Sequence, residues 1–346
     1  MARLRWLGLM AALGLAACRP AAAPPAAPST TGAAPAAVAA AAPTASPVPL
    51  QSIKLTYPSE GMCCLPIFAA RDRGFFARNG IDAETVAMTS DRAMAAVASG
   101  ELHYVGGVGT ASVAAAALGV PIRAAWISAS SPAYTLFSRP EIRTLDDLRG
   151  KRVGVPGFGG TSAVSMGQAL KHYGIDASRD LVLLQIGTDE LILESLRSGV
   201  LDGAPLTAPQ SLSARREGFN ALLNVADVVQ MPLGGLSVSV ERLNEGDQAH
   251  RVIRALTEAQ QWILQNRDEG VEMIMHALNV DRPTAEGTYD ETMPTYQSKG
   301  LVSREGIENI LQIVRDSGRT GPDVRYEDVA DGRIAEAVAR ELGLIP

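Results

Sequence analysis

Cysteine, histidine and lysine are scarce in this chain of 346 residues, which has only three cysteines, four histidines and four lysines. No two cysteines or histidines have the C-x-x-C or H-x-x-x-H spacing that is typical of a zinc site. The sequence therefore predicts no metal site. We expect structural or surface roles for the histidines, which are His103, His172, His250 and His276.

Basic side chains are also fewer than acidic ones. The chain has 31 Lys and Arg against 37 Asp and Glu, so its formal net charge is −6, and it contains no basic run. This balance disfavours a nucleic-acid partner. After residue 50 no stretch is long and apolar enough to cross a membrane.

The first residues have the pattern of a secretory leader sequence. Arg3 and Arg5 form a short basic region, an apolar run follows, and the small residues of LAAC end at Cys18. We expect a signal peptide over residues 1–17. Because LAAC resembles the lipobox of bacterial lipoproteins, it implies cleavage before Cys18 and a diacylglycerol on its sulfur. The alternative is a plain secreted protein with a chance cysteine.

Residues 18–51 are rich in Ala and Pro and predict a disordered tether. With a lipid on Cys18, this tether would hold the folded part on the periplasmic or extracytoplasmic face of a membrane, without crossing it. Removing the leader takes away Arg3 and Arg5 but no acid, which leaves 29 basic and 37 acidic side chains, or −8.

From residue 52 onward, short apolar runs alternate with helical patterns. This alternation predicts two α/β blocks, over about 52–128 and 144–229, with mostly parallel sheets. The segments 128–138 and 228–240 connect the blocks. The rest of the chain predicts a helical tail packed on the first block, with helices at 248–265, 268–278, 282–293 and 303–317.

Four stretches carry a resemblance to a known family: LPIFAARDRGFFARNGIDAETVAM, MAAVASGELHYVGGVGTASVAAAALGVPIRAA, IRTLDDLRGKRVGV and ESLRSGVLDGA. Together they resemble the type II periplasmic solute-binding proteins, in the branch that serves nitrate, alkanesulfonate and thiamine-pyrimidine uptake. The resemblance runs from about residue 53 to about residue 240.

The resemblance implies an α/β clamshell with mixed sheets and a helical C-terminal region. Lobe I would comprise residues 52–130 and 235–346, and lobe II residues 131–234. A monomer would trap a small organic solute between the lobes by hinge closure and deliver it to an ABC permease with its ATPase. The solute would be thiamine-pyrimidine-like, sulfonate-like or aromatic, and no cofactor is expected.

Loops at the carboxyl ends of the strands should line the cleft, because ligands of open α/β sheets bind there. The candidate substrate-binding residues are Ser59, Glu60, Cys63, Cys64, Leu65, Thr89, Ser90, Gly109, Thr110, Trp126, Ser128, Gly159, Gly160, Thr161, Ser162, Asp189, Pro205 and Thr207.

The most specific candidate is the loop PGFGGTS, residues 156–162. Its glycines and the N-terminus of the following helix favour binding of an anion or a polar group. The alternative is a helix cap without a ligand. VGGVGTAS, residues 105–112, offers a similar helix start, and the alternative there is tight packing of helix on strand without a ligand. Trp126 is either a stacking platform or core. Three carboxylates could pair with a cationic solute: Glu60, Asp189 and Asp202. The alternative is that they are solvated or cap helices, and we interpret Asp189 as a helix cap.

Two rival functions remain. The same fold hosts a thiamine-pyrimidine synthase with clustered cysteines and a pyridoxal-phosphate lysine, but this chain has only Cys63-Cys64 and no lysine on a predicted cleft loop. We therefore expect no catalytic residue. The other rival is a module that presents its bound solute to a membrane receptor.

Cys63 and Cys64 lie in the loop after the first strand. Two adjacent sulfurs do not make a tetrahedral zinc site, and no partner base marks a nucleophile. They are either thiols that line the cleft or a vicinal disulfide.

Overall fold

A computed structural model describes residues 50–58, 61–316, 318, 320 and 323–346. The predicted signal peptide, the lipidation of Cys18, most of the tether, and the candidates Ser59 and Glu60 lie outside the described residues. Within the described part, no helix combines the length and the apolar character that a membrane span needs.

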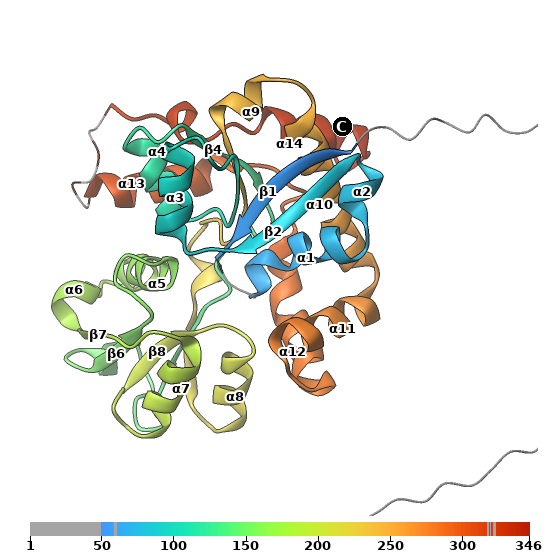
Figure 1. Ribbon diagram of the computed structural model, residues 1–346. Coiled ribbons are helices and arrows are strands. Elements are labelled where there is room, and N and C mark those ends of the chain that lie inside the picture. The colour runs from blue at the N-terminus through green and yellow to red at the C-terminus, as the bar shows by residue number, and fades with distance from the viewer. Residues whose placement is uncertain (1–49, 59–60, 317, 319, 321–322) are drawn as a thin grey trace, which may run out of the picture. The chain divides into compact units, whose positions relative to one another are not determined.

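The first sheet has the strand order β2-β1-β3-β10-β4. β1 pairs in parallel with β2 and β3, whereas β10 is antiparallel to both β3 and β4. The long arrows of β1 and β2 are clear in Figure 1. The strands are β1 (Gln51–Tyr57), β2 (Ile81–Ala87), β3 (Tyr104–Gly106), β4 (Ile122–Ile127) and β10 (Gly235–Ser239).

The second sheet has the order β7-β6-β8-β5-β9. β6 pairs in parallel with β7 and β8, and β5 is antiparallel to β8 and β9. Its strands are β5 (Thr135–Ser138), β6 (Arg152–Val155), β7 (Val182–Gln185), β8 (Gly203–Leu206) and β9 (Asn220–Asn224). We call each sheet with the helices packed on it a lobe, the first and the second.

Both sheets are mixed, as the resemblance implied: in each, four strands run in the same direction and one is antiparallel to them. The antiparallel strands β5 and β10 come from the two segments that were expected only to connect the blocks. Each segment crosses between the lobes and then runs along the sheet it enters, against the direction of its neighbours.

Helices follow the strands in the predicted alternation. In the first lobe they are η1 (Met62–Cys64), α1 (Leu65–Asp72), α2 (Phe75–Arg78), α3 (Ser90–Ala98) and α4 (Thr110–Ala117). In the second they are η2 (Asp146–Leu148), α5 (Thr161–His172), α6 (Ala177–Asp180), α7 (Asp189–Arg197), α8 (Gln210–Arg216) and η3 (Val225–Asp227).

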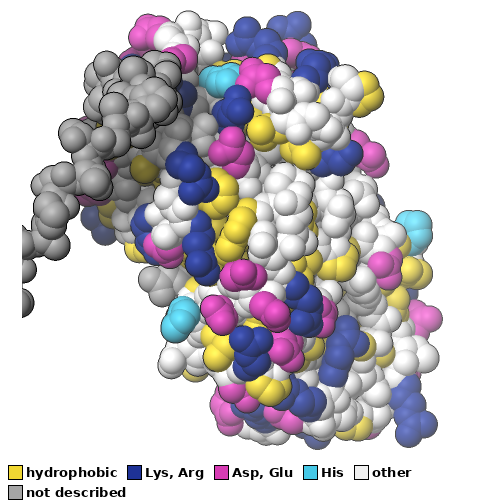
Figure 2. Space-filling model, turned by 90° about the vertical axis from the view of Figure 1, so that its right-hand side faces the viewer, with side chains coloured by type: hydrophobic (Ala, Val, Ile, Leu, Met, Phe, Trp, Pro, Cys, Tyr) yellow, Lys and Arg dark blue, Asp and Glu magenta, His cyan; other side chains and the backbone are white. Residues whose placement is uncertain are grey.

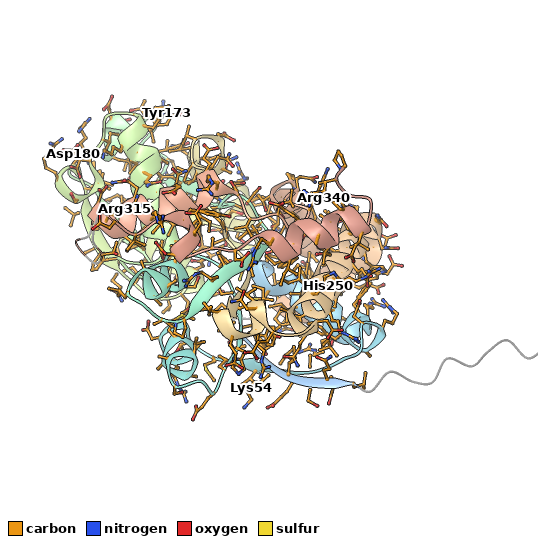
Figure 3. All side chains as sticks on the ribbon, turned by 90° about the horizontal axis from the view of Figure 1, so that it is seen from above. Lys54, Tyr173, Asp180, His250, Arg315 and Arg340 are labelled. Atoms are coloured by element: carbon orange, nitrogen blue, oxygen red, sulfur yellow. The ribbon has the colours of Figure 1, made fainter. Side chains whose placement is uncertain are left out.

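The tail is helical, as predicted. It consists of α9 (Val240–Asn244), α10 (Gln248–Gln265), α11 (Arg267–Leu278), α12 (Arg282–Thr292), η4 (Met293–Tyr296), α13 (Arg304–Asp316), η5 (Tyr326–Asp328) and α14 (Arg333–Glu341). α10 packs on α1, α2 and α14, and α13 packs on α4, so the tail completes the first lobe. His250, labelled in Figure 3, has its Nε2 2.9 Å from Glu341 Oε1 of α14.

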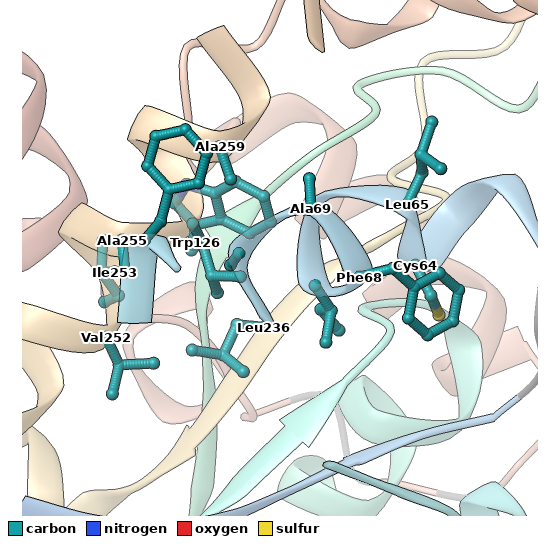
Figure 4. Packing of buried hydrophobic residues seen from close by; sticks show 14 of the residues in the cluster. Cys64, Leu65, Phe68, Ala69, Trp126, Leu236, Val252, Ile253, Ala255 and Ala259 are labelled. Carbon is teal, nitrogen blue, oxygen red and sulfur yellow. The ribbon is translucent and has the colours of Figure 1, made fainter. Parts of the chain in front are cut away.

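The core of the first lobe forms where α1 and α10 cover the sheet (Figure 4). Trp126 of β4 is 1% exposed, and its indole N–H donates a 2.9 Å hydrogen bond to Thr257 Oγ1 of α10. The buried indole therefore has its polar atom satisfied inside the core, as buried tryptophans require.

Basic and acidic side chains are mixed over the surface, and Figure 2 shows this on one face. Many form exposed ion pairs, such as Arg197 with Glu217 and Arg304 with Glu327. Pairs of this kind contribute little to stability individually.

Candidate functional site

A cavity of about 560 Å³ is lined by residues of both lobes. We call it the interlobe cavity. The first lobe contributes Gly61, Met62, Cys63, Leu278, Thr292, Thr295 and Tyr296, and the crossing segments contribute Ala129, Ala133, Tyr134 and Leu233. The second lobe contributes Pro156, Gly187, Thr188, Asp189, Glu190, Thr207, Ala208, Pro209 and Gln210.

Asp189 is the most unusual residue of the interlobe cavity. The helix cap is its neighbour Thr188, whose side chain accepts a hydrogen bond from the N–H of Leu191, so the interpretation of Asp189 as the cap is wrong. Asp189 instead accepts a 3.2 Å hydrogen bond from Thr207 Oγ1. Burial raises the pKa of Asp189 to about 6, the Thr207 bond opposes this shift, and the charge of Glu190 adds to it.

Two tyrosines, Tyr134 and Tyr296, line the same cavity as Asp189. Burial raises the pKa of Tyr134, and the carboxylate of Asp189 raises it further. Tyr296 donates a hydrogen bond to the carbonyl of Met62, and burial raises its pKa as well. Both hydroxyls are therefore neutral at physiological pH and can take part in hydrogen bonds as donors or acceptors.

The lining is acidic. Among the described lining residues, Asp189 and Glu190 are the only side chains that carry a charge at pH 7, and none is Lys, Arg or His. Glu190 is exposed and accepts a 2.9 Å hydrogen bond from Gln210. Across the described part of the chain, no group of three His, Cys, Asp or Glu side chains is placed to hold a metal ion.

Cys63 and Cys64 form the last part of η1, which the chain enters after β1. Their sulfurs are 3.4 Å apart, a hydrogen-bond distance that is far longer than a disulfide of about 2.05 Å. Cys64 is fully buried in the first-lobe core, while Cys63 is half-buried and lines the cavity. The structure thus favours the dithiol over the vicinal disulfide, and gives the two sulfurs different surroundings.

We expect iodoacetamide to alkylate Cys63 of the native protein and to leave Cys64 unmodified until the protein unfolds, because only Cys63 faces the cavity. A solute bound in the cavity should slow the reaction several-fold. Peptide mass spectrometry measures both rates, and Cys64 in the same sample is the internal control. Labelling that requires prior reduction would show that the sulfurs are joined, against the geometry described above.

The two glycine loops lie against each other. Thr110 Oγ1 donates a 3.1 Å hydrogen bond to the carbonyl of Gly159, and a Cβ on Gly109 would lie 3.1 Å from Thr161 Oγ1. Of the loop PGFGGTS, only Pro156 lines the interlobe cavity. The glycines therefore serve a close contact between the lobes at one edge of the cavity.

A second contact joins the lobes through α8 and α12. Ser211 donates a 2.5 Å hydrogen bond to Glu291, and Arg215 lies 4.0 Å from the same carboxylate. Arg216 also donates a 3.4 Å hydrogen bond to Thr284. These hydrogen bonds and the glycine-loop contact join the two lobes, and residues of both lobes line the cavity.

The structure places three of the predicted residues in the cavity lining, namely Cys63, Asp189 and Thr207. Gly109, Thr110, Gly159, Gly160, Thr161 and Ser162 belong to the contacting glycine loops and the helices that follow them. Cys64, Leu65, Trp126, Ser128 and Pro205 are buried outside the lining, and Thr89 and Ser90 lie at the start of α3. Asp202 is bound by Arg152, away from the cavity.

Sequence reasoning missed Tyr134 and Tyr296. Neither lies in a loop that follows a strand, where the site residues were expected. Tyr134 lies in the first crossing segment, and Tyr296 ends the turn after α12. The only signal was a tyrosine next to proline-containing turns, in SSPAY and MPTY. Such a signal identifies a turn but not the side of the molecule that it faces.

Residues 63–270, more than half of the chain, match the family described as NMT1/THI5 like. No curated protein matches the chain. Similar solved structures include the periplasmic aliphatic sulphonate-binding protein SsuA of Escherichia coli, with 14% identity, a TM-score of 0.69, and coverage of 81% of this chain and 92% of that one.

Two further structures are similar. The alkanesulfonate-binding protein SsuA of Xanthomonas axonopodis pv. citri, bound to MOPS, has 15% identity, a TM-score of 0.61, and coverage of 79% and 92%. A Candida albicans protein with the generic periplasmic-binding-protein fold has 17% identity, a TM-score of 0.60, and coverage of 84% and 95%. The chain therefore belongs to the NMT1/THI5 like family and has the two-lobed α/β fold of the type II periplasmic solute-binding proteins.

Proposed function

We propose that this protein captures a small organic solute in the interlobe cavity and delivers it to an ABC permease with its ATPase. The observation that carries the proposal is a cavity lined by both lobes and flanked by two interlobe contacts. Hinge closure around a ligand produces this arrangement. The sulfonates named for the similar SsuA structures support a small solute as cargo.

The predicted signal peptide and lipobox suggest where the protein acts and how it is anchored. The mature protein would be a monomer, held on the extracytoplasmic face of a membrane by a lipid on Cys18, with the residues before β1 as tether. Its role would be capture without catalysis, since the described cavity lining offers no lysine for a Schiff base and no histidine as a general base.

The proposal is tested by stripping the protein of ligand through unfolding and refolding, then screening small solutes by thermal shift. A true ligand at 100 times its Kd stabilises the native state by about 2.7 kcal/mol. Mass spectrometry of small molecules released from the native protein should identify the same compound.

A variant that fills the cavity gives the control. Ala133→Trp places a large ring in the interlobe cavity and should abolish the shift, whereas Leu118→Trp, at an exposed position on the first lobe, should keep it. A solute that stabilises both variants equally would place its site elsewhere. The absence of any released or stabilising solute would contradict the proposal.

A further inference from the structure

We propose that the solute carries a positively charged nitrogen, an organic ammonium or amidinium, which forms an ion pair with Asp189. The inference rests on the proposed function and narrows it to one class of solute. It also separates this cavity from the sulfonates named for the structural neighbours, which are anions.

The charged side chains that line the cavity are negative. The described lining presents the carboxyl groups of Asp189 and Glu190 and no basic side chain. A sulfonate or nitrate in this cavity would lie near two negative charges, without the arginine or lysine that usually neutralises such anions. Clefts that carry one sign of charge concentrate ligands of the opposite sign.

Among the described residues, no basic side chain neutralises Asp189. Its described polar partners are the hydroxyl of Thr207 and the nearby start of α7, which is the positive end of the helix dipole. The charged group that acts on it is Glu190, which adds negative charge, and the hydroxyl of the nearby Tyr134 is neutral. A partly buried carboxylate in such surroundings is stabilised by a cation, and a solute in the cavity can supply it.

Aromatic and apolar side chains form part of the remaining cavity lining. Tyr134 and Tyr296 line the same cavity as Asp189, and aromatic rings and phenol oxygens both attract cations. Leu233, Leu278 and Pro209 supply apolar surface. A volume of about 560 Å³ with this mixture is typical of sites for small organic molecules. The cavity therefore fits a compact organic body with one cationic group.

The test uses refolded, ligand-free protein at pH 8 and three matched series of probes. Benzyl, cyclohexylmethyl and butyl bodies each carry an ammonium, a hydroxyl or a sulfonate group. We expect ammonium members to raise the melting temperature and to bind at least tenfold more tightly than the alcohols, while the sulfonates give no shift. Tighter binding of alcohols or sulfonates would overturn the inference and leave the proposed function intact.

A matched pair of variants tests the residue itself. Asp189→Asn keeps the shape and should lower the affinity for the best ammonium probe at least 100-fold, with no more than a threefold change for the alcohol of the same body. Glu190→Gln, which removes an exposed carboxylate bound to Gln210, should lower ammonium affinity less than fivefold. The melting curve of each variant without ligand confirms that it is folded.

Three results separate the possible failures. Unchanged ammonium binding by Asp189→Asn would overturn the inference. A native protein that releases only an anionic or neutral small molecule would overturn it too, while supporting solute capture. If no probe binds and the native protein releases nothing, both the inference and the proposed function fail.

Discussion

The variant Asp189→Asn is expected to be more stable than the natural protein at pH 8 in the absence of ligand. The pKa of Asp189 rises from 3.8 to about 6, and each unit corresponds to 1.36 kcal/mol, so its buried charge destabilises the native state by up to about 3 kcal/mol. An amide of the same shape removes that charge. The loss of the ligand-pairing group and the gain in stability should therefore occur together, as at many functional sites.

The pH dependence of this gain has a defined sign. The folded state holds the proton of Asp189 more tightly than the unfolded state, so this carboxyl group destabilises the protein progressively as pH rises from about 4 to about 6. The difference between variant and natural protein should be near zero at pH 4 and fully developed at pH 8. Urea unfolding at several pH values measures it.

Glu190→Gln is the control for the first prediction, because it removes a neighbouring charge from an exposed position. It should change the free energy of unfolding by less than about 0.5 kcal/mol at either pH. A difference between Asp189→Asn and the natural protein that does not vary with pH would show that the carboxylate is well solvated, and would weaken its role as an unpaired charge.

The second large effect is expected from Gly235→Ala, which should lower the free energy of unfolding by more than about 4 kcal/mol. Gly235 begins β10 with φ +142°, and a Cβ there would overlap the carbonyl oxygen of Trp126 and lie 3.0 Å from Ile127 Cα. These are backbone atoms of the adjacent strand β4, which cannot rotate away. The substitution therefore forces β10 and β4 apart at the point where the chain returns from the second lobe.

Gly119→Ala separates this overlap from the cost of the backbone angle. Gly119 has φ +94° and no atom within 4 Å of the Cβ position, so only the left-handed conformation is penalised, by about 1–2 kcal/mol. Urea unfolding followed by tryptophan fluorescence compares the two variants. Equal losses would mean that the strands adjust to the methyl group without cost.

The helices were largely predictable because their signals are local. The apolar spacing of residues 248–265 predicted α10 with the same ends that the structure has. β5 and β10 were not predicted as strands, because each is short and its partners are distant in sequence: Thr135 pairs with Leu206 and Asn224, and Ser237 with Val105. The alternation of Leu236, Ser237, Val238 and Ser239 is a strand signal, but which distant strands β10 pairs with is not encoded in the segment itself.

The candidate site was partly predictable for a related reason. Asp189 and Thr207 were identified because they follow strands β7 and β8, whose ends face the cavity. Tyr134 and Tyr296 were missed because their positions depend on the paths of the crossing segment and the tail. The glycine loops were located correctly at strand ends, but the contact of Thr110 with Gly159 depends on how the lobes meet, which no local pattern encodes.

The place of β10 between β3 and β4 also sets the order in which the sheets can form during synthesis. All five strands of the second sheet lie between Thr135 and Asn224, so they are present before β10 has been made. Among the described residues, every strand partner of β4 comes later in the chain: β10, Gly300 and Ala330. The apolar segment of β4 is therefore the last to gain its backbone partners, and the one longest exposed to wrong pairing in a growing chain.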